Sequence, residues 1–138
     1  MVRTRNLFIS HSWTYADTYE SFRDLLDAAP RFSYRDYSVP RDNPVHNARN
    51  SEALYDAIFK RMRFCEVVII MAGKYATYSK WITREIKIAN REFTYPKPIL
   101  AVRPWSSLQI SSVVSDAADI TVGWSTASVV RAIRELAP

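Results

Sequence analysis

An uninterrupted apolar run, Val67 to Met71, most constrains how this chain can fold. A strand with one face in water alternates apolar and polar residues, whereas a strand buried on both faces is apolar throughout. Runs of this kind are typical of the interior of a parallel sheet that helices cover on both sides. We therefore predict a buried strand over Cys65–Met71, ended by Gly73, at the centre of an α/β sheet.

The rest of the chain alternates between strand and helix patterns. Further strands are expected at 6–10, 32–39, 99–102 and 119–122, where short apolar or alternating runs lie between turn residues. Helices are expected from Thr14 to Pro30, over 51–62 and 79–93, and from Ser125 onward, with a short irregular or helical piece before the last strand. Five such pairs, joined by right-handed crossovers, predict a flavodoxin-like three-layer sandwich whose five parallel strands follow the order 2-1-3-4-5.

The chain has 138 residues, of which 48% are hydrophobic and 24% charged. This length suits one domain with one core, so we expect a single domain over residues 1–138. No apolar stretch approaches the roughly 20 residues of a membrane span, and the first residues lack the apolar segment of a signal peptide. We expect a cytoplasmic protein that does not bind membranes.

The numbers of cysteines and histidines and the distribution of basic residues argue against several classes of site. Cys65 is the only cysteine, so no disulfide within the chain is possible, and it is interpreted as a small buried hydrophobe. Two histidines without cysteine partners give no metal-binding pattern. The net charge is +5, but the arginines are scattered without forming a stripe, so nucleic-acid binding is not expected.

The predicted strand order places a candidate site at the mouth between the first and third strands. In open α/β sheets, ligands bind at the carboxyl ends of the strands, where the strand order reverses. Ser10, His11 and Trp13 follow the first strand and would face residues 73–85 after the third. The polar loop 40–50, which contains Asp42 and Asn43, would lie over the same crevice.

Trp81 and Glu85 are four residues apart near the start of the predicted third helix, so they share one face of it. A carboxylate and an indole side by side can line one wall of a ligand pocket. Each also has a simpler explanation, because such a glutamate is usually a solvated charge and a tryptophan there can simply anchor the helix on the sheet. His11 is as well suited to bonding backbone as to touching a substrate.

These segments resemble the TIR domain. The resemblance rests on Phe8-Ile9-Ser10-His11-Ser12 as the first strand, on the loop after the second strand, and on Ser79-x-Trp81-x-x-x-Glu85 at the start of the third helix. A finer likeness, to the TIR-like branch typified by the ThsB subunit of bacterial Thoeris anti-phage systems, rests on four segments: Phe8–Trp13, Met71–Tyr75, Arg103–Trp105 and Val122–Trp124.

The resemblance implies a flavodoxin-like sheet and an enzyme that cleaves NAD+ to nicotinamide and a cyclic ADP-ribose isomer. It further implies a separate effector protein that this product activates, a phage component as the trigger, and self-association. Glu85 is then the expected catalytic residue. The expected substrate-binding residues are Ser10, His11, Trp13, Asp42, Asn43, Tyr75 and Trp81.

The chemistry is compatible with a single carboxylate. Nicotinamide leaves ribose as a neutral pyridine and needs no general acid, unlike the leaving groups of ordinary glycosidases. Glu85 would stabilise positive charge at the anomeric carbon, and Trp81 or Trp13 would stack on a ring. The chain has only two glycines and no G-x-G-x-x-G motif, so NAD+ is expected as a substrate and not as a resident cofactor.

Two alternatives stay open. A nucleoside deoxyribosyltransferase-like enzyme also places a carboxylate at an anomeric carbon, and a non-enzymatic TIR adaptor would act by homotypic assembly. A receiver-like module is not supported, because the acidic residues that it needs after the first and third strands are missing. A Ser/His/Asp hydrolase lacks its nucleophile elbow.

Overall fold

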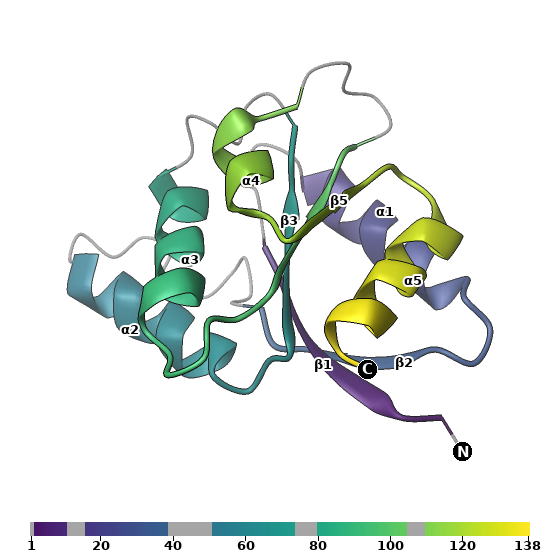
Figure 1. The fold of residues 1–138 in the computed structure, drawn as a ribbon, viewed down its shortest axis with the longest axis horizontal. Coiled ribbons are helices and arrows are strands. Elements are labelled where there is room, and N and C mark those ends of the chain that lie inside the picture. Colours follow the sequence, from purple (N-terminus) through teal and green to yellow (C-terminus); the bar gives the residue numbers. More distant parts are fainter. Residues whose placement is uncertain (1, 11–15, 39–50, 74–79, 105–109) are drawn as a thin grey trace.

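The computed structural model describes residues 2–10, 16–38, 51–73, 80–104 and 110–138. The strands are β1 (Thr4–Ile9), β2 (Ser33–Asp36), β3 (Val67–Met71), β4 (Ile99–Val102) and β5 (Ile120–Val122). The helices are α1 (Ala16–Asp27), α2 (Ser51–Met62), α3 (Lys80–Arg91), α4 (Ser112–Ala117) and α5 (Thr126–Leu136). Strands and helices alternate along the described chain, as the sequence predicts (Figure 1).

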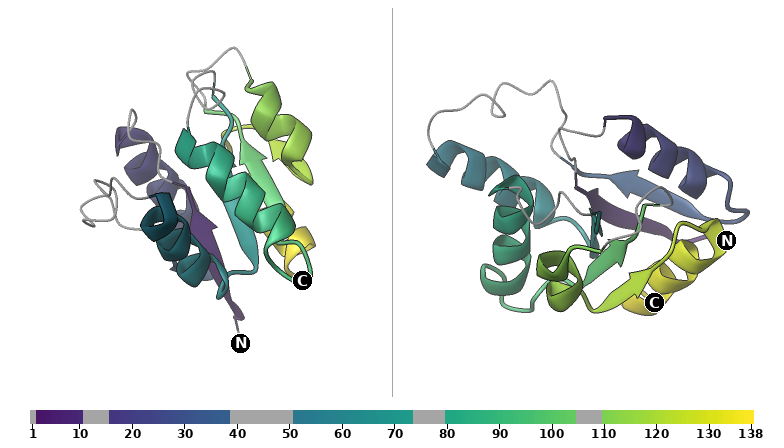
Figure 2. Two further views of the ribbon diagram at one scale, coloured as in Figure 1. Left: turned by 90° about the vertical axis from the view of Figure 1, so that its left-hand side faces the viewer. Right: turned by 90° about the horizontal axis from the view of Figure 1, so that it is seen from above.

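All five strands are parallel and lie in the order β2-β1-β3-β4-β5. The predicted strand order and the flavodoxin-like α/β class are therefore confirmed. β3 lies at the centre of the sheet, and each of its residues is at most 7% exposed. The continuous apolar run is explained by this position, since β3 has strands on both sides and helices over both faces (Figure 2).

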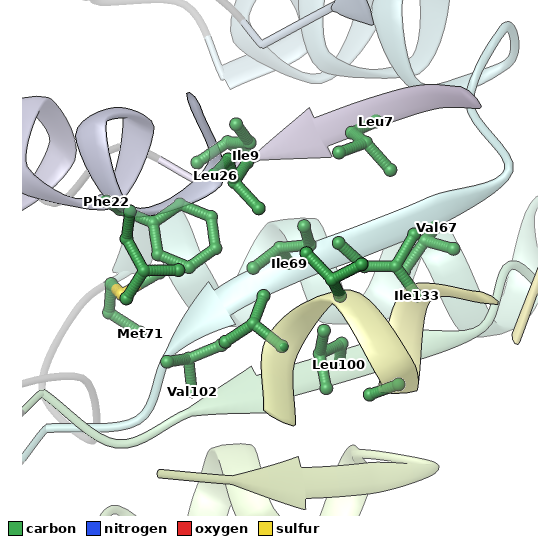
Figure 3. Close-up of a cluster of buried hydrophobic side chains, with 14 of the residues drawn as sticks. Leu7, Ile9, Phe22, Leu26, Val67, Ile69, Met71, Leu100, Val102 and Ile133 are labelled. Carbon is green, nitrogen blue, oxygen red and sulfur yellow. The ribbon is translucent and has the colours of Figure 1, made fainter. Parts of the chain in front are cut away.

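The helices and the sheet bury two clusters of apolar side chains, one on each face of the sheet. Residues alternate between the faces along a strand, so Leu7 and Ile9 of β1 enter one cluster and Phe8 enters the other. The first cluster, here called the α1/α5 layer, is shown in Figure 3, where Phe22, Leu26 and Ile133 lie against the sheet. The second, here called the α3 layer, is formed with side chains of α2, α3 and α4.

Several element boundaries agree with the sequence patterns. Helix α2 and strand β4 have the predicted limits, and the piece before β5 is the short helix α4. Ser125 caps α5 as expected, because its side chain accepts a hydrogen bond from the backbone N–H of Ser128. Cys65 is buried, as predicted, and burial raises the pKa of its thiol to about 12.

Other boundaries were predicted wrongly. Strand β2 ends at Asp36 and not at residue 39, because the backbone N–H of Ser38 turns back to the Asp36 carboxylate at 2.9 Å. Strand β3 begins at Val67 and not at Cys65, whose N–H instead closes the end of α2 on the carbonyl of Met62. Strand β5 begins one residue later than predicted, and α3 ends two residues earlier. Thr14, Ser79 and the loop 40–50 lie outside the described residues.

Candidate functional site

The carboxyl ends of β1 and β3 lie side by side, at the point where the strand order reverses. Ser10 follows β1, and its backbone N–H donates to the carbonyl of Ile69 in β3 at 2.8 Å. This bond continues the sheet by one residue, so the backbone of Ser10 is fixed at the mouth between the two strands. Its side chain is buried, with 3% of the residue exposed.

Helix α3 brings a carboxyl group to this mouth from within its apolar face. Trp81, Ile82, Ile88 and Ala89 are all buried, which marks the face of the helix that packs on the sheet. Glu85 lies between them on the same face and is only 1% exposed. A carboxyl group therefore occupies a position that the helical pattern otherwise fills with apolar side chains.

Both oxygens of the Glu85 carboxyl have hydrogen-bond partners. The indole N–H of Trp81, one helical turn earlier, donates to Oε2 at 2.9 Å. The hydroxyl of Ser10, which follows β1 and is distant from α3 in the sequence, donates a hydrogen bond to Oε1. Ser10, Trp81 and Glu85 thus form one buried cluster that joins β1 to α3.

Burial raises the pKa of Glu85 from its usual value near 4.5 to about 8. Removal from water is the main cause, because it disfavours the charged form of a carboxyl group. The hydrogen bonds from Ser10 and Trp81 act in the opposite direction, since they stabilise the carboxylate, but their effect is smaller. The raised pKa favours the neutral, protonated form of Glu85.

A second polar cluster lies where β2 ends. The hydroxyl of Tyr19 in α1 donates to the carboxylate of Asp36, which also accepts the backbone N–H of Ser38. Burial is the main cause that raises the pKa of Tyr19 to about 12. The sequence reasoning missed this cluster, although polar residues at 36 and 38, flanking Tyr37, were a signal for a strand end with buried polar groups.

The start of α4 lies beside the end of β3. The backbone N–H of Ser111 donates to the carbonyl of Ala72 at 2.9 Å, and Gly73 forms an isolated bridge with Ile110. Ser111 is buried and caps α4. Neither contact was expected from the sequence.

The structure brings together three of the predicted site residues, Ser10, Trp81 and Glu85. The other five lie outside the described residues: His11, Trp13, Asp42, Asn43 and Tyr75. Trp81 belongs to the α3 layer and is 7% exposed, so in this structure its ring packs in the core while its N–H binds Glu85. Its predicted stacking on a substrate ring stays a prediction.

Trp124 lies away from the cluster and packs edge-on against Phe22, with 5.8 Å between ring centroids. In the part of the chain that the structure describes, no three His, Cys, Asp or Glu side chains come together as metal ligands would. None of the described helices is long and apolar enough to cross a bilayer.

The buried cluster has the elements of a site that stabilises positive charge. A carboxyl group that is held by two donors at the carboxyl edge of the sheet, and that has no second acid beside it among the described residues, can bind hydroxyl groups or face a cation once it is ionised. Within the part of the chain that the structure describes, the cluster contains one carboxyl group and not the pair that glycosidases use for acid and base catalysis.

A comparison with curated proteins gives no match. A comparison with family models gives a match over residues 8–109, to the model described as Thoeris protein ThsB, TIR-like domain. The matched segment covers most of the chain and runs from β1 to beyond β4, so it contains Ser10, Trp81 and Glu85 together with the central strands. With this match and the flavodoxin-like sheet, the chain belongs to the family of Thoeris ThsB TIR-like domains.

Proposed function

We propose that this protein is a TIR-like enzyme of anti-phage defence that cleaves NAD+ to nicotinamide and a cyclic ADP-ribose isomer. The observation that carries the proposal is the Glu85 carboxyl, buried at the switch point of the sheet and bound by Trp81 and Ser10. The family match and the resemblance of the Trp81 and Glu85 segment to enzymatic TIR domains support the same assignment.

In the proposed reaction, the bond between the ribose anomeric carbon and the pyridinium nitrogen of NAD+ breaks. Its electron pair leaves with nicotinamide, which becomes neutral, and positive charge grows on the sugar. The Glu85 carboxylate stabilises this charge in a site that excludes water, where an electrostatic interaction is stronger than in bulk solvent. A nucleophilic atom of the same ADP-ribose then attacks the anomeric carbon and loses a proton, which closes the ring.

This chemistry needs Glu85 in its charged form, whereas the resting structure favours the protonated form. Binding of the substrate can shift Glu85 from its protonated form to its charged form. A positive charge close to a carboxyl group favours ionisation and lowers its pKa, and the nicotinamide ring of NAD+ carries such a charge. Binding of NAD+ next to Glu85 would therefore promote loss of the proton, so the carboxylate forms where it is needed.

The proposal includes partners that act before and after this step. The cyclic product diffuses to a separate effector protein and activates it, a phage component switches the enzyme on, and self-association completes the site. NAD+ is the substrate and leaves as products in every turnover, so no resident cofactor is required.

The test is an assay for nicotinamide release, with mass detection of products. Purified protein at high concentration is incubated with NAD+, alone and with lysate of phage-infected cells. We expect nicotinamide and a product of cyclic ADP-ribose mass. Glu85→Gln should lower the rate by at least about 1,000-fold, because it removes the charge while keeping the shape of the side chain.

Glu92→Gln is the matched control, since it makes the same chemical change on an exposed residue just beyond α3 and should leave the rate unchanged. Intact NAD+ in every condition would contradict the enzymatic proposal and favour a non-enzymatic adaptor. Transfer of a deoxyribosyl group from a deoxynucleoside, without NAD+ cleavage, would favour the deoxyribosyltransferase-like alternative.

A further inference from the structure

We propose that Ser10 is a positioning residue that acts through Glu85, holding its carboxyl group in one orientation in both of its protonation states. The catalytic consequence rests on the proposed function, whereas the coupling between the two side chains does not. Ser10 was expected to bind substrate. That expectation stays a prediction; in the structure, the Ser10 hydroxyl has a partner within the protein, and this partner is the expected catalytic group.

The backbone N–H of Ser10 is anchored to the sheet, as such a role requires. Its N–H is fixed on the carbonyl of Ile69 at 2.8 Å, in register with the pairing of β1 and β3. The residue is 3% exposed, so water does not compete for its hydroxyl. Ser10 therefore presents Oγ to Glu85 from the sheet, whereas Trp81 approaches from the same helix as Glu85.

The two partners of Glu85 differ in the hydrogen bonds that they can form. An indole N–H only donates, so Trp81 fixes Oε2 as an acceptor whether or not Glu85 is charged. When Glu85 is neutral, its proton is then placed on Oε1, which faces Ser10.

A serine hydroxyl both donates and accepts, because its hydrogen can rotate. It accepts a bond from the neutral acid and donates one to the carboxylate. Of the two partners, only Ser10 can thus reverse the direction of its hydrogen bond when Glu85 gains or loses its proton, without movement of heavy atoms.

No other charged side chain of the described residues contributes to the shift in the pKa of Glu85. Arg84 and Lys87 lie near Glu85 in the sequence of α3, but both are more exposed and neither contributes to the shift in its pKa. From β1, β3 and the other described elements around the cluster, no ionisable side chain contributes either. In the described structure, the titration of Glu85 depends on burial, on Trp81 and on Ser10.

Removing the Ser10 hydroxyl should raise the pKa of Glu85. Both states of the carboxyl group lose a partner, but a hydrogen bond to a charged oxygen is stronger than one to a neutral group. The charged form therefore loses more, and ionisation shifts to higher pH. The carboxyl group also loses one of the two hydrogen bonds that restrain its last torsion angle, which makes it a poorer match for a developing positive charge.

The experiment is a titration of the Glu85 carboxyl by carbon NMR in the full chain, with the signal assigned by its loss in Glu85→Gln. We expect Ser10→Ala to raise the midpoint by about one pH unit. Ser10→Thr retains a hydroxyl and should restore the wild-type midpoint. Ser111→Ala removes a similarly buried hydroxyl that caps α4, and it should leave the midpoint unchanged.

Should Ser10→Ala fold poorly, Ser10→Cys provides the same test, because a thiol is a weaker hydrogen-bonding group of similar shape, and the midpoint should rise by a smaller amount. An unchanged Glu85 midpoint in a folded Ser10→Ala or Ser10→Cys protein would overturn the proposal.

Kinetics separate this proposal from the proposed function. In an active enzyme, Ser10→Ala should lower kcat about 10-fold at neutral pH, with little change in KM, and should move the acidic limb of kcat/KM upward with the NMR midpoint. A ten-fold loss without movement of the limb would indicate a structural role only and would also overturn the proposal. A shifted midpoint in a protein that never cleaves NAD+ would support the coupling and contradict the proposed function.

Discussion

Folding and the proposed reaction require different protonation states of Glu85. Its neutral form suits the buried face of α3, while the proposed reaction needs its charged form. Ser10 and Trp81 reduce this conflict, because their hydrogen bonds stabilise the carboxylate without exposing it to water. The stability of the folded protein is therefore linked to the ionisation of one side chain.

We predict that this link makes stability depend on pH. The folded protein keeps the Glu85 proton up to about pH 8, whereas the unfolded chain releases it near 4.5. Between these values the folded state binds more protons, so the free energy of unfolding falls as pH rises. The contribution of Glu85 is complete below about pH 4.5 and is lost as pH rises through about 8.

Glu85→Gln isolates this contribution, because an amide oxygen can accept from Trp81 while its NH2 group donates to Ser10. Relative to wild type, the variant should gain about 1.4 kcal/mol for each pH unit between pH 5 and 8. Urea unfolding of both proteins over this range measures the difference. Parallel curves for the two proteins would show that Glu85 is not protonated in the folded state.

The sequence predicted part of this site. The spacing of Trp81 and Glu85 was sufficient to place them on one helical face, and the strand order was sufficient to place Ser10 nearby. Nothing in the residues showed that Glu85 would be buried, because a helix periodicity fixes which residues share a face but not what covers that face. The five predicted contacts in loops stay predictions.

At the scale of the elements, the sequence predicted correctly some helix and strand limits that depend only on neighbouring residues. The limits of α2 and β4 and the cap at Ser125 follow from nearby residues alone. The sequence did not predict limits that depend on competing hydrogen bonds. At the end of β2, the backbone N–H of Ser38 binds the Asp36 carboxylate and does not continue the strand. That competition is decided by three-dimensional packing, which periodicity does not contain.

We predict that the cap of α5 contributes to stability without affecting activity. Ser125→Ala removes the side-chain oxygen that accepts the N–H of Ser128, and it should lower the free energy of unfolding by about 1 kcal/mol. NAD+ cleavage should be unchanged, because α5 packs on the face of the sheet opposite to α3.

Ser128→Ala is the control for the cap, since it keeps the backbone N–H and should cost little. Denaturant unfolding of the two variants provides the measurement. Equal losses from the two variants would show that the cap bond at 3.4 Å does not contribute.

At the scale of the whole molecule, the sheet separates two packed layers (Figure 2). Trp81 and Ile82 belong to the α3 layer, so packing there is continuous with the candidate site. Ile133 belongs to the α1/α5 layer on the other face. Defects in the two layers should therefore have different effects.

We predict that Ile82→Val and Ile133→Val each lower the free energy of unfolding by about 1 kcal/mol. Their effects should add within about 0.5 kcal/mol in the double variant, because the sheet separates the two sites. Only Ile82→Val should slow NAD+ cleavage, since Ile82 belongs to the same buried cluster as Trp81. Unfolding and rate measurements on the three proteins test this, and a strong non-additive term would show that the layers act as one.

The separation of the layers also bears on how the protein can be engineered. Substitutions at a catalytic centre commonly trade stability for activity, so a protein with little reserve tolerates few of them. Here additional stability can be built into α1 and α5, which pack on the face of the sheet opposite to α3. A thermostabilised α1/α5 layer would keep even damaging variants of the cluster folded, which opens the cluster to saturation mutagenesis.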